Sequence, residues 1–294
     1  MELTLWHGLA LAAAVLYPLG SIWTKLAVQH GGGVMRSTLL SNWMLALLGL
    51  ALIPGIDATP DWSQVHWPLM AAGVFLVGQV GTVLAVRAGD VSVQTPMMGM
   101  KVVFVALLTM MIRPEDVSPG IWLAVALSAA AMFLIAGGSL AMMRANTAAV
   151  GWSLLACAGY ASTDLFMAYG SEGFGRAAFL PVTLWFMGAA SLLCLPLVRE
   201  GFDKVPPAAW RWLLPGSGMF AVQGLLICLA VTFGRKAPEM NVLYSIRGAT
   251  AVVMVWLVGR WLGSQEGQLT GRSVLLRRLI GALAMAGALI VLLT

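Results

Sequence analysis

Hydrophobic residues occupy most of this 294-residue chain in ten long stretches, which short polar links separate. Each stretch holds roughly 20 residues, enough for a helix to cross the ~30 Å hydrocarbon core of a bilayer. The links contain residues that favour turns, such as Gly31-Gly32-Gly33 and Pro206-Pro207. The pattern therefore predicts an all-α membrane protein with ten transmembrane helices, at approximately residues 5–27, 37–54, 67–87, 93–112, 119–141, 149–170, 178–198, 210–233, 238–259 and 274–293.

Two motifs in the first half of the chain return in the second half at similar offsets. Gly8 and Tyr17 match Gly151 and Tyr160 at an offset of 143 residues, and Leu84-Ala85-Val86 matches Leu229-Ala230-Val231 at an offset of 145 residues. With five stretches in each half, these offsets predict two five-helix repeats within one membrane domain, residues 1–144 and 145–294. Since five is odd, the second repeat would enter the membrane from the opposite side. Such inverted repeats are typical of secondary transporters, which bind substrate near the midplane where the repeats meet.

The composition favours a membrane protein and argues against several other classes. Hydrophobic residues make up 60% of the chain and charged residues 10%, compared with ~25% charged residues in soluble domains. The net charge of +5 comes from basic residues scattered at the ends of the stretches, so no nucleic-acid partner is expected. The cysteines and histidines lack the spacing of a metal site and no P-loop indicates an ATP-driven pump, so no cofactor is expected.

Lys and Arg residues are distributed unequally between the two sets of links. With their flanks, the links after odd-numbered stretches hold eleven of them, and the links after even-numbered stretches hold four. The positive-inside rule then places both termini outside the cytoplasm. We expect a multi-pass integral protein of a bacterial inner (plasma) membrane.

A similar block of features closes each half of the chain. In the first half, a stretch with Pro96 and Gly99 is followed by the acidic turn 115–119 and a stretch that ends at Gly137-Gly138; in the second half, the order is Pro238–Gly259, the turn 263–270 and Gly281–Leu293. On these features and the five-plus-five arrangement, the full chain resembles the drug/metabolite transporter superfamily in its EamA-like form. The resemblance implies a ten-helix transporter of small organic metabolites with a central cavity and alternating access. Family members are usually drawn with both termini in the cytoplasm, so the orientation stays open.

Two basic residues lie deep inside stretches, Lys101 in the fourth and Arg247 in the ninth. A charge at the centre of a membrane costs ~2.5–3.5 kcal/mol or more, so it usually faces a cavity or a partner. If both face one cavity, they would bind a carboxylate or phosphate, Arg247 in a fork and Lys101 as a point charge. Family members that move phosphorylated sugars and nucleotide sugars are similar in using basic residues on these two helices. The alternatives are a structural ion pair and snorkelling to the interface.

Asp164 is the one acid well inside a stretch, the sixth. It would bind a substrate amine, carry a proton, or form a salt bridge to Lys101 or Arg247 that keeps the empty cavity neutral. These roles are compatible, since such a bridge could exchange with substrate.

Further candidates for the cavity wall are aromatic and amide side chains inside the stretches. Tyr244 stands three residues before Arg247, on the same face of a helix. Packing between helices is the alternative for each candidate. The set is Tyr17, Tyr160, Tyr244, Gln79 and Gln223.

These observations favour a secondary transporter that moves a small anionic or zwitterionic metabolite by alternating access, either coupled to protons or by exchange. A flippase for a lipid or lipid phosphate is the alternative, since a phosphate would suit the same cations. An integral-membrane enzyme is less favoured, because the short links hold no cluster of acids, histidines or nucleophiles. Glycine-rich faces leave a homodimer open.

Overall fold

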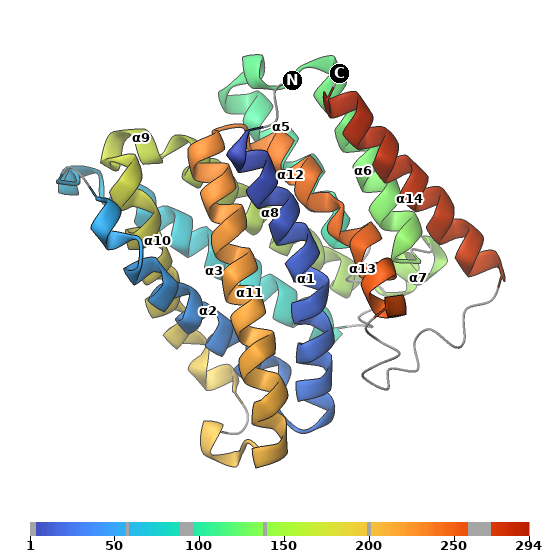
Figure 1. Cartoon of the computed structure of the whole chain (residues 1–294), viewed down its shortest axis with the longest axis horizontal. Coiled ribbons are helices and arrows are strands. Elements are labelled where there is room, and N and C mark those ends of the chain that lie inside the picture. Colours follow the sequence, from blue (N-terminus) through green and yellow to red (C-terminus); the bar gives the residue numbers. More distant parts are fainter. Residues whose placement is uncertain are drawn as a thin grey trace.

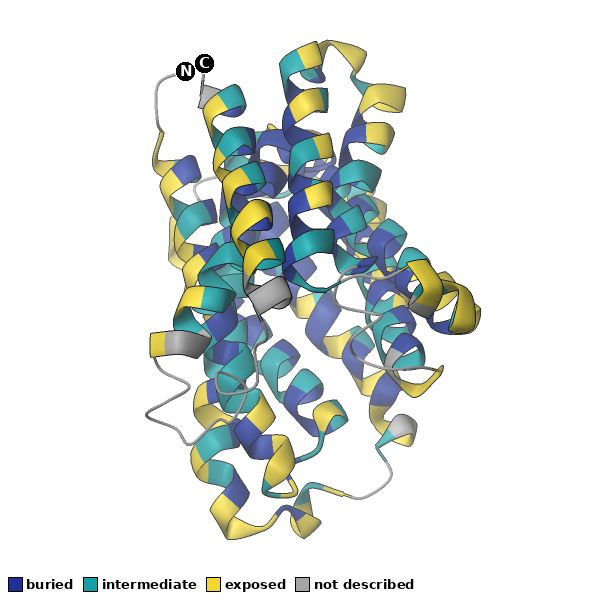
Figure 2. Ribbon diagram, turned by 90° about the vertical axis from the view of Figure 1, so that its right-hand side faces the viewer, coloured by how far each residue is buried: buried dark blue, intermediate teal, exposed yellow. Residues whose placement is uncertain are grey.

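The computed structural model of this chain is a bundle of helices around a buried interior (Figures 1 and 2). It describes residues 4–56, 59–88, 97–137, 140–198, 201–257 and 272–293, and within these ranges it contains helices and no strands. Helix α1 (Leu5–Gln29) begins and helix α14 (Arg272–Leu293) ends at the same end of the bundle (Figure 1).

Helices coincide with the apolar stretches of the sequence, and each stretch overlaps at least one of them. Apolar side chains occur on every face of these helices. Some are therefore buried between neighbouring helices, and the others lie on the outer surface of the bundle. The other helices are α2 (Val34–Leu50), α3 (His66–Ala88), α5 (Lys101–Ile112), α6 (Pro119–Ile135), α7 (Leu140–Ala145), α8 (Thr147–Tyr169), α9 (Ser171–Phe174), α10 (Arg176–Ser191), α11 (Pro207–Gly234), α12 (Ala237–Ser245) and α13 (Arg247–Leu257).

Helix boundaries follow local sequence signals where the structure describes them. Helix α6 starts with Pro119 in its first turn, and the Ser118 hydroxyl accepts a hydrogen bond from the backbone N–H of Ile121 at 3.3 Å. Pro18 lies inside α1, which continues as one helix on both sides of it. Pro96 and the turn 263–270 lie outside the described residues.

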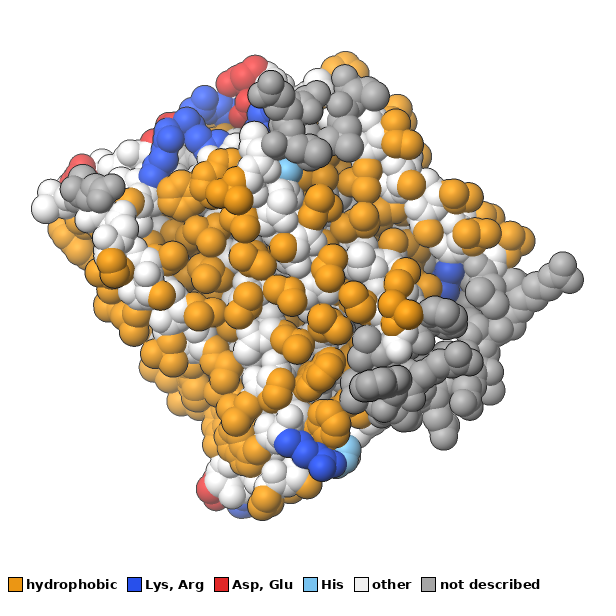
Figure 3. All heavy atoms as spheres, viewed as in Figure 1, with side chains coloured by type: hydrophobic (Ala, Val, Ile, Leu, Met, Phe, Trp, Pro, Cys, Tyr) orange, Lys and Arg blue, Asp and Glu red, His pale blue; other side chains and the backbone are white. Residues whose placement is uncertain are grey.

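The length and polarity of the helices are compatible with a membrane. Four helical segments in the described ranges are long and apolar enough to cross one: Leu5–Gln29, Trp62–Ala85, Arg176–Pro196 and Pro207–Gly234. Large hydrophobic side chains are also exposed on outer faces, such as Met111 at 82% and Leu193 at 73%. In Figure 3, hydrophobic side chains cover the middle of one face, and most charged side chains gather at its upper and lower ends. Such a surface suits contact with lipid.

Long helices pair along their lengths: α1 with α11, α3 with α8, and α6 with α14. Glycines allow the close approach of α3 and α8. A Cβ atom added to Gly159 of α8 would lie 2.6 Å from the backbone N of Gly78 and 2.7 Å from the carbonyl O of Val74. Small residues at such interfaces let two backbones approach, which is how membrane helices commonly pack.

Replacing Gly159 by Ala should therefore destabilise the protein by about 1–3 kcal/mol, because the added methyl group would meet backbone atoms that have no freedom to turn away. Gly151→Ala is the matched control in the same helix, since a Cβ there meets nothing within 4 Å. Thermal unfolding of the two purified variants in detergent compares them. Equal melting midpoints would contradict the close packing of α3 on α8.

Candidate functional site

The helical segment that carries Arg247 is interrupted directly before it. Helix α12 ends at Ser245 and α13 begins at Arg247, and between them the Ile246 N–H donates to the Leu243 carbonyl at 3.2 Å, a tighter turn than that of an α-helix. Lys101 likewise is the first residue of α5, after the 3₁₀ turn Met98–Met100. The sequence predicted unbroken spans with the cations near their middles. The structure instead places each cation directly after a tighter turn of its helical segment.

Lys101 is paired with the carboxylate that the sequence singled out. Its Nζ lies 2.6 Å from Oδ2 of Asp164, and the two side chains are 13% and 12% exposed. The amide Nδ2 of Asn241 donates to the same oxygen at 2.8 Å. Helices α5, α8 and α12 therefore meet at one carboxylate oxygen, and the charge of Lys101 is compensated.

Arg247 lies between two tyrosine rings. Its Cζ is 5.0 Å from the ring centre of Tyr17 and 4.3 Å from that of Tyr244, and these rings are nearly perpendicular to each other. Cation–π contacts of this kind contribute about 0.5–2 kcal/mol. Within the described ranges, no carboxylate lies at ion-pair distance from Arg247. The cluster of Lys101, Asp164 and Arg247 consequently carries one net positive charge.

Tyr244 connects the two cations. Besides its contact with Arg247, its ring centre lies 6.0 Å from Nζ of Lys101. Its hydroxyl donates to Oε1 of Gln223 at 2.7 Å, and the amide Nε2 of Gln223 donates to the Phe220 carbonyl at 3.2 Å. Gln223 thus fixes the orientation of the ring that both cations share.

Two of the predicted residues make their hydrogen bonds elsewhere. Gln79 and Asn42 form a reciprocal amide pair between α3 and α2, with both bonds at 3.0 Å. The hydroxyl of Tyr160 lies 3.2 Å from that of Thr82 on α3. These contacts join helices to one another, as the packing alternative expects.

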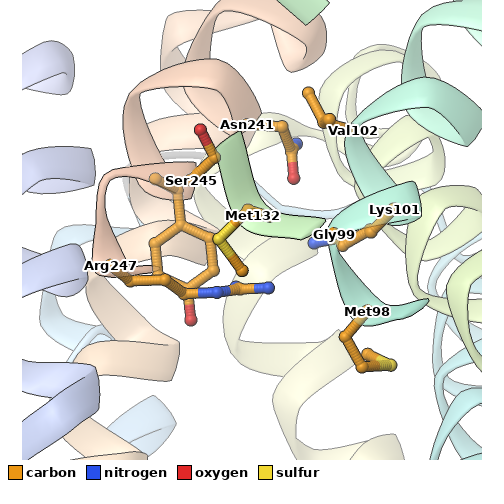
Figure 4. A pocket seen from close by; sticks show the side chains of 9 residues that line it. Met98, Gly99, Lys101, Val102, Met132, Asn241, Ser245 and Arg247 are labelled. Atoms are coloured by element: carbon orange, nitrogen blue, oxygen red, sulfur yellow. The ribbon is translucent and has the colours of Figure 1, made fainter. Parts of the chain in front are cut away.

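A small cavity opens beside the charged cluster (Figure 4). It has an empty volume of about 230 Å³, part of it open to solvent, and its wall includes Lys101, Met132, Asn241 and Arg247. Arg247 extends into it from one side, Lys101 lies on the opposite side, and Met132 lies between them (Figure 4). The part of this space that the protein encloses holds about one water molecule, so a metabolite can enter only if the wall opens.

Sequence reasoning missed several residues of this site. Asn241 and Ser245 line the cavity from α12, and Met132 lines it from α6. A signal was present for one of them: Asn241 stands three residues before Tyr244, so the two share a helix face that ends at Arg247. Met132 carried no such signal, because a methionine in an apolar helix is usually packing.

Comparisons with known proteins establish the fold and leave the function undetermined. No protein-family model matches this chain, and no curated protein matches it. Twenty-seven chains of solved structures match. One of them, described as a crystal structure of a protein, aligns with 97% of this chain and 95% of its own length, with a TM-score of 0.69 and 12% sequence identity. Similarity at this level of identity concerns the fold alone.

Removing either partner of the Lys101–Asp164 pair should cost about 3–5 kcal/mol of folding free energy, because the other charge would stay buried without compensation. We expect Lys101→Met and Asp164→Asn to be strongly destabilising alone and much less than additive together. The comparison is Arg176→Ala, which removes an exposed ion pair to Glu172 at 3.4 Å and should cost at most ~1 kcal/mol. A double-mutant cycle by thermal unfolding measures the coupling. Additive single effects would mean that the two residues do not act as a pair.

Proposed function

We propose that this protein is a secondary transporter that moves a small anionic or zwitterionic metabolite by alternating access. The observation that carries the proposal is Arg247. Its half-buried guanidinium follows a helix break and faces a cavity, with aromatic rings around it and no carboxylate partner among the described residues. A charged side chain inside a membrane costs free energy, so its presence there suggests a functional site. A substrate anion would supply the missing counter-charge.

The proposal includes a multi-pass protein of a bacterial inner (plasma) membrane with ten spans. The apolar helices and their exposed hydrophobic faces support it. It also agrees with the position of the first and last helices, since an even number of crossings returns the chain to the side from which it began (Figure 1).

The inverted repeat of residues 1–144 and 145–294 is likewise part of the proposal, and the aromatic contacts support it. Tyr17 of α1 packs edge-on against Phe220 of α11, with ring centres 5.4 Å apart. Tyr160 of α8 packs in the same manner against Phe75 of α3, at 5.7 Å. The two tyrosines are 143 residues apart and the two phenylalanines 145, which are the offsets of the repeated motifs.

The contacts between helices also support two equivalent halves. If the first half is superimposed on the second, α1 corresponds to α8 and α3 to α11, so the pair α1–α11 becomes the pair α8–α3. Both pairs are in lengthwise contact, while α6 and α14, which correspond to each other, pack together. Transporters built in this way bind substrate where the repeats meet, and the proposal is supported by the cavity that Lys101 of the first half and Arg247 of the second half both line.

The charge of the cluster narrows the substrate class. With Lys101 neutralised by Asp164, one positive charge remains on Arg247, and it is balanced by a monoanion such as a carboxylate. A zwitterion would place its carboxylate on Arg247 and its amine on Asp164, displacing Lys101. A lipid phosphate would bind the same guanidinium. The flippase and the metabolite transporter therefore share one binding site and differ only in the molecule that binds there.

A thermal-shift screen tests the proposal. Carboxylates, amino acids, phosphorylated sugars and lipid phosphates are added separately to purified protein in detergent, because a ligand that binds the folded state raises the melting midpoint. We expect one of the water-soluble anions to stabilise the wild type. Arg247→Ala should lose this shift entirely, and Lys101→Ala should reduce it.

Arg176→Ala is the matched control, since that residue lies outside the cavity and its side chain is 46% exposed. It should keep the wild-type shift. If lipid phosphates alone stabilise the wild type, the flippase takes the place of the metabolite transporter. If anions stabilise all the variants equally, or none of them, the two cations are structural and the proposed site is wrong.

A further inference from the structure

A second group of buried titratable side chains lies where α1 and α12 begin. His7 is in the first turn of α1 and Glu239 is in the first turn of α12, and the residues are only 3% and 8% exposed. The histidine Nε2 lies 3.6 Å from the carboxylate Oε2. The substrate site described above uses neither residue.

The hydrogen bonds around this pair define where its protons are. The backbone N–H of Thr4 donates to Nδ1 of His7 at 3.0 Å, so in this arrangement the ring proton is on Nε2, directed at Glu239. On the other side, Lys236 donates to Oε1 of Glu239 at 3.0 Å. Nε2 and Oε2 are both buried without a hydrogen-bond partner among the described residues, and 3.6 Å is too long for a hydrogen bond.

The surroundings of His7 are already arranged for a second ring proton. The Thr4 hydroxyl oxygen lies 2.7 Å from Nδ1, so it can accept a hydrogen bond from that nitrogen once it is protonated. The imidazolium would then donate from Nδ1 to Thr4 and attract the Glu239 carboxylate with a full charge at Nε2. The hydrogen bond from the backbone N–H of Thr4 to Nδ1 is lost, because a protonated Nδ1 cannot accept it.

Helix α12 carries Glu239 of this pair and also part of the substrate site. Two residues after Glu239, Asn241 donates to the carboxylate of Asp164, and Tyr244 lies over Arg247 one turn further on. A shift of α12 toward α1 would therefore change the contacts of Asp164 and Arg247 together.

We propose that His7 and Glu239 form a proton-binding site that is coupled through α12 to the substrate site. The ligand is a proton, bound as the His7 imidazolium facing the Glu239 carboxylate, and it is the ion to which transport is coupled. Only the coupling to substrate rests on the proposed transport function; binding of the proton does not. Other charged groups around the pair are already engaged: Lys236 with Glu239, Arg235 at the end of α11 with Glu172 of α9, and Lys101 of α5 with Asp164 of α8.

The experiment first measures proton binding without substrate. Melting midpoints of the purified protein in detergent are recorded between about pH 5 and 8, the range in which histidine changes its charge. Proton binding by this pair in the folded state makes the melting midpoint depend on pH. We expect this dependence in the wild type and its loss in both Glu239→Gln and His7→Gln.

His66→Asn is the control, because His66 is exposed and distant from Glu239 in the sequence; it should keep the wild-type dependence. Two variants are used so that one that fails to fold does not decide the outcome. If both glutamine variants keep the pH dependence of the wild type, the proton site does not exist.

The second measurement tests the coupling, with potassium acetate and inorganic phosphate as separate anion probes. We expect the melting shift caused by the effective probe to change more between about pH 5 and pH 8 in the wild type than in Glu239→Gln, where only the ionisation of the probe itself changes. A shift that depends on pH equally in both proteins overturns the coupling. If neither probe shifts the wild type at any pH, the proposed substrate site is called into question, while the melting curves without ligand still decide the proton site.

Discussion

The ion pair between Lys101 and Asp164 is the interaction on which the rest of the site depends. A lysine buried among apolar helices is tolerated when its charge is compensated, and the 2.6 Å contact supplies that compensation. The pair also fixes geometry, because Asn241 donates to the same oxygen and thereby joins a third helix to α5 and α8. Since the carboxylate is committed to Lys101, it leaves Arg247 as the uncompensated charge. The positive charge of the cavity lies on Arg247 because Asp164 pairs with Lys101.

Arg247 is stabilised by a different mechanism, which explains the tyrosines around it. Two ring faces at 4.3 and 5.0 Å stabilise a guanidinium without neutralising it, so the charge is held and still available to an anion. Arginine suits this role better than lysine, because its planar group stacks on aromatic rings and leaves its N–H donors free at the edge. Gln223 contributes indirectly, since its hydrogen bond holds the Tyr244 hydroxyl and with it the orientation of the ring.

Helix α12 provides a physical connection between the cavity and the end of the bundle. It carries the buried Glu239 in its first turn, continues through Asn241 and Tyr244, and stops at the break before Arg247. Glu239, Asn241 and Tyr244 all lie on this nine-residue helix, so a displacement of the whole helix would change the contacts of all three. Two states of α12 would be enough for a proton at one end to alter affinity at the other, which is the requirement for thermodynamic coupling between sites.

The sequence by itself determined that the chain is mainly helical and apolar. It also singled out Lys101, Arg247 and Asp164, because a charged residue inside a long apolar stretch is costly to bury. It also named Tyr17, Tyr244 and Gln223 among the surrounding side chains.

The sequence did not determine which cation pairs with Asp164. Asp164 is distant from both Lys101 and Arg247 in the sequence, and the pairing depends on how α5, α8 and α13 pack. Gln79 and Tyr160 were equally plausible from the sequence, and only the tertiary structure shows that they form hydrogen bonds with Asn42 and Thr82 on neighbouring helices. The sequence has no proline or glycine at Ile246 that would predict the helix break there. The burial of Glu239 against His7 depends on the approach of α1 to α12. Residue types and apolar length are properties of the local sequence, whereas partners and breaks arise where helices distant in the chain meet.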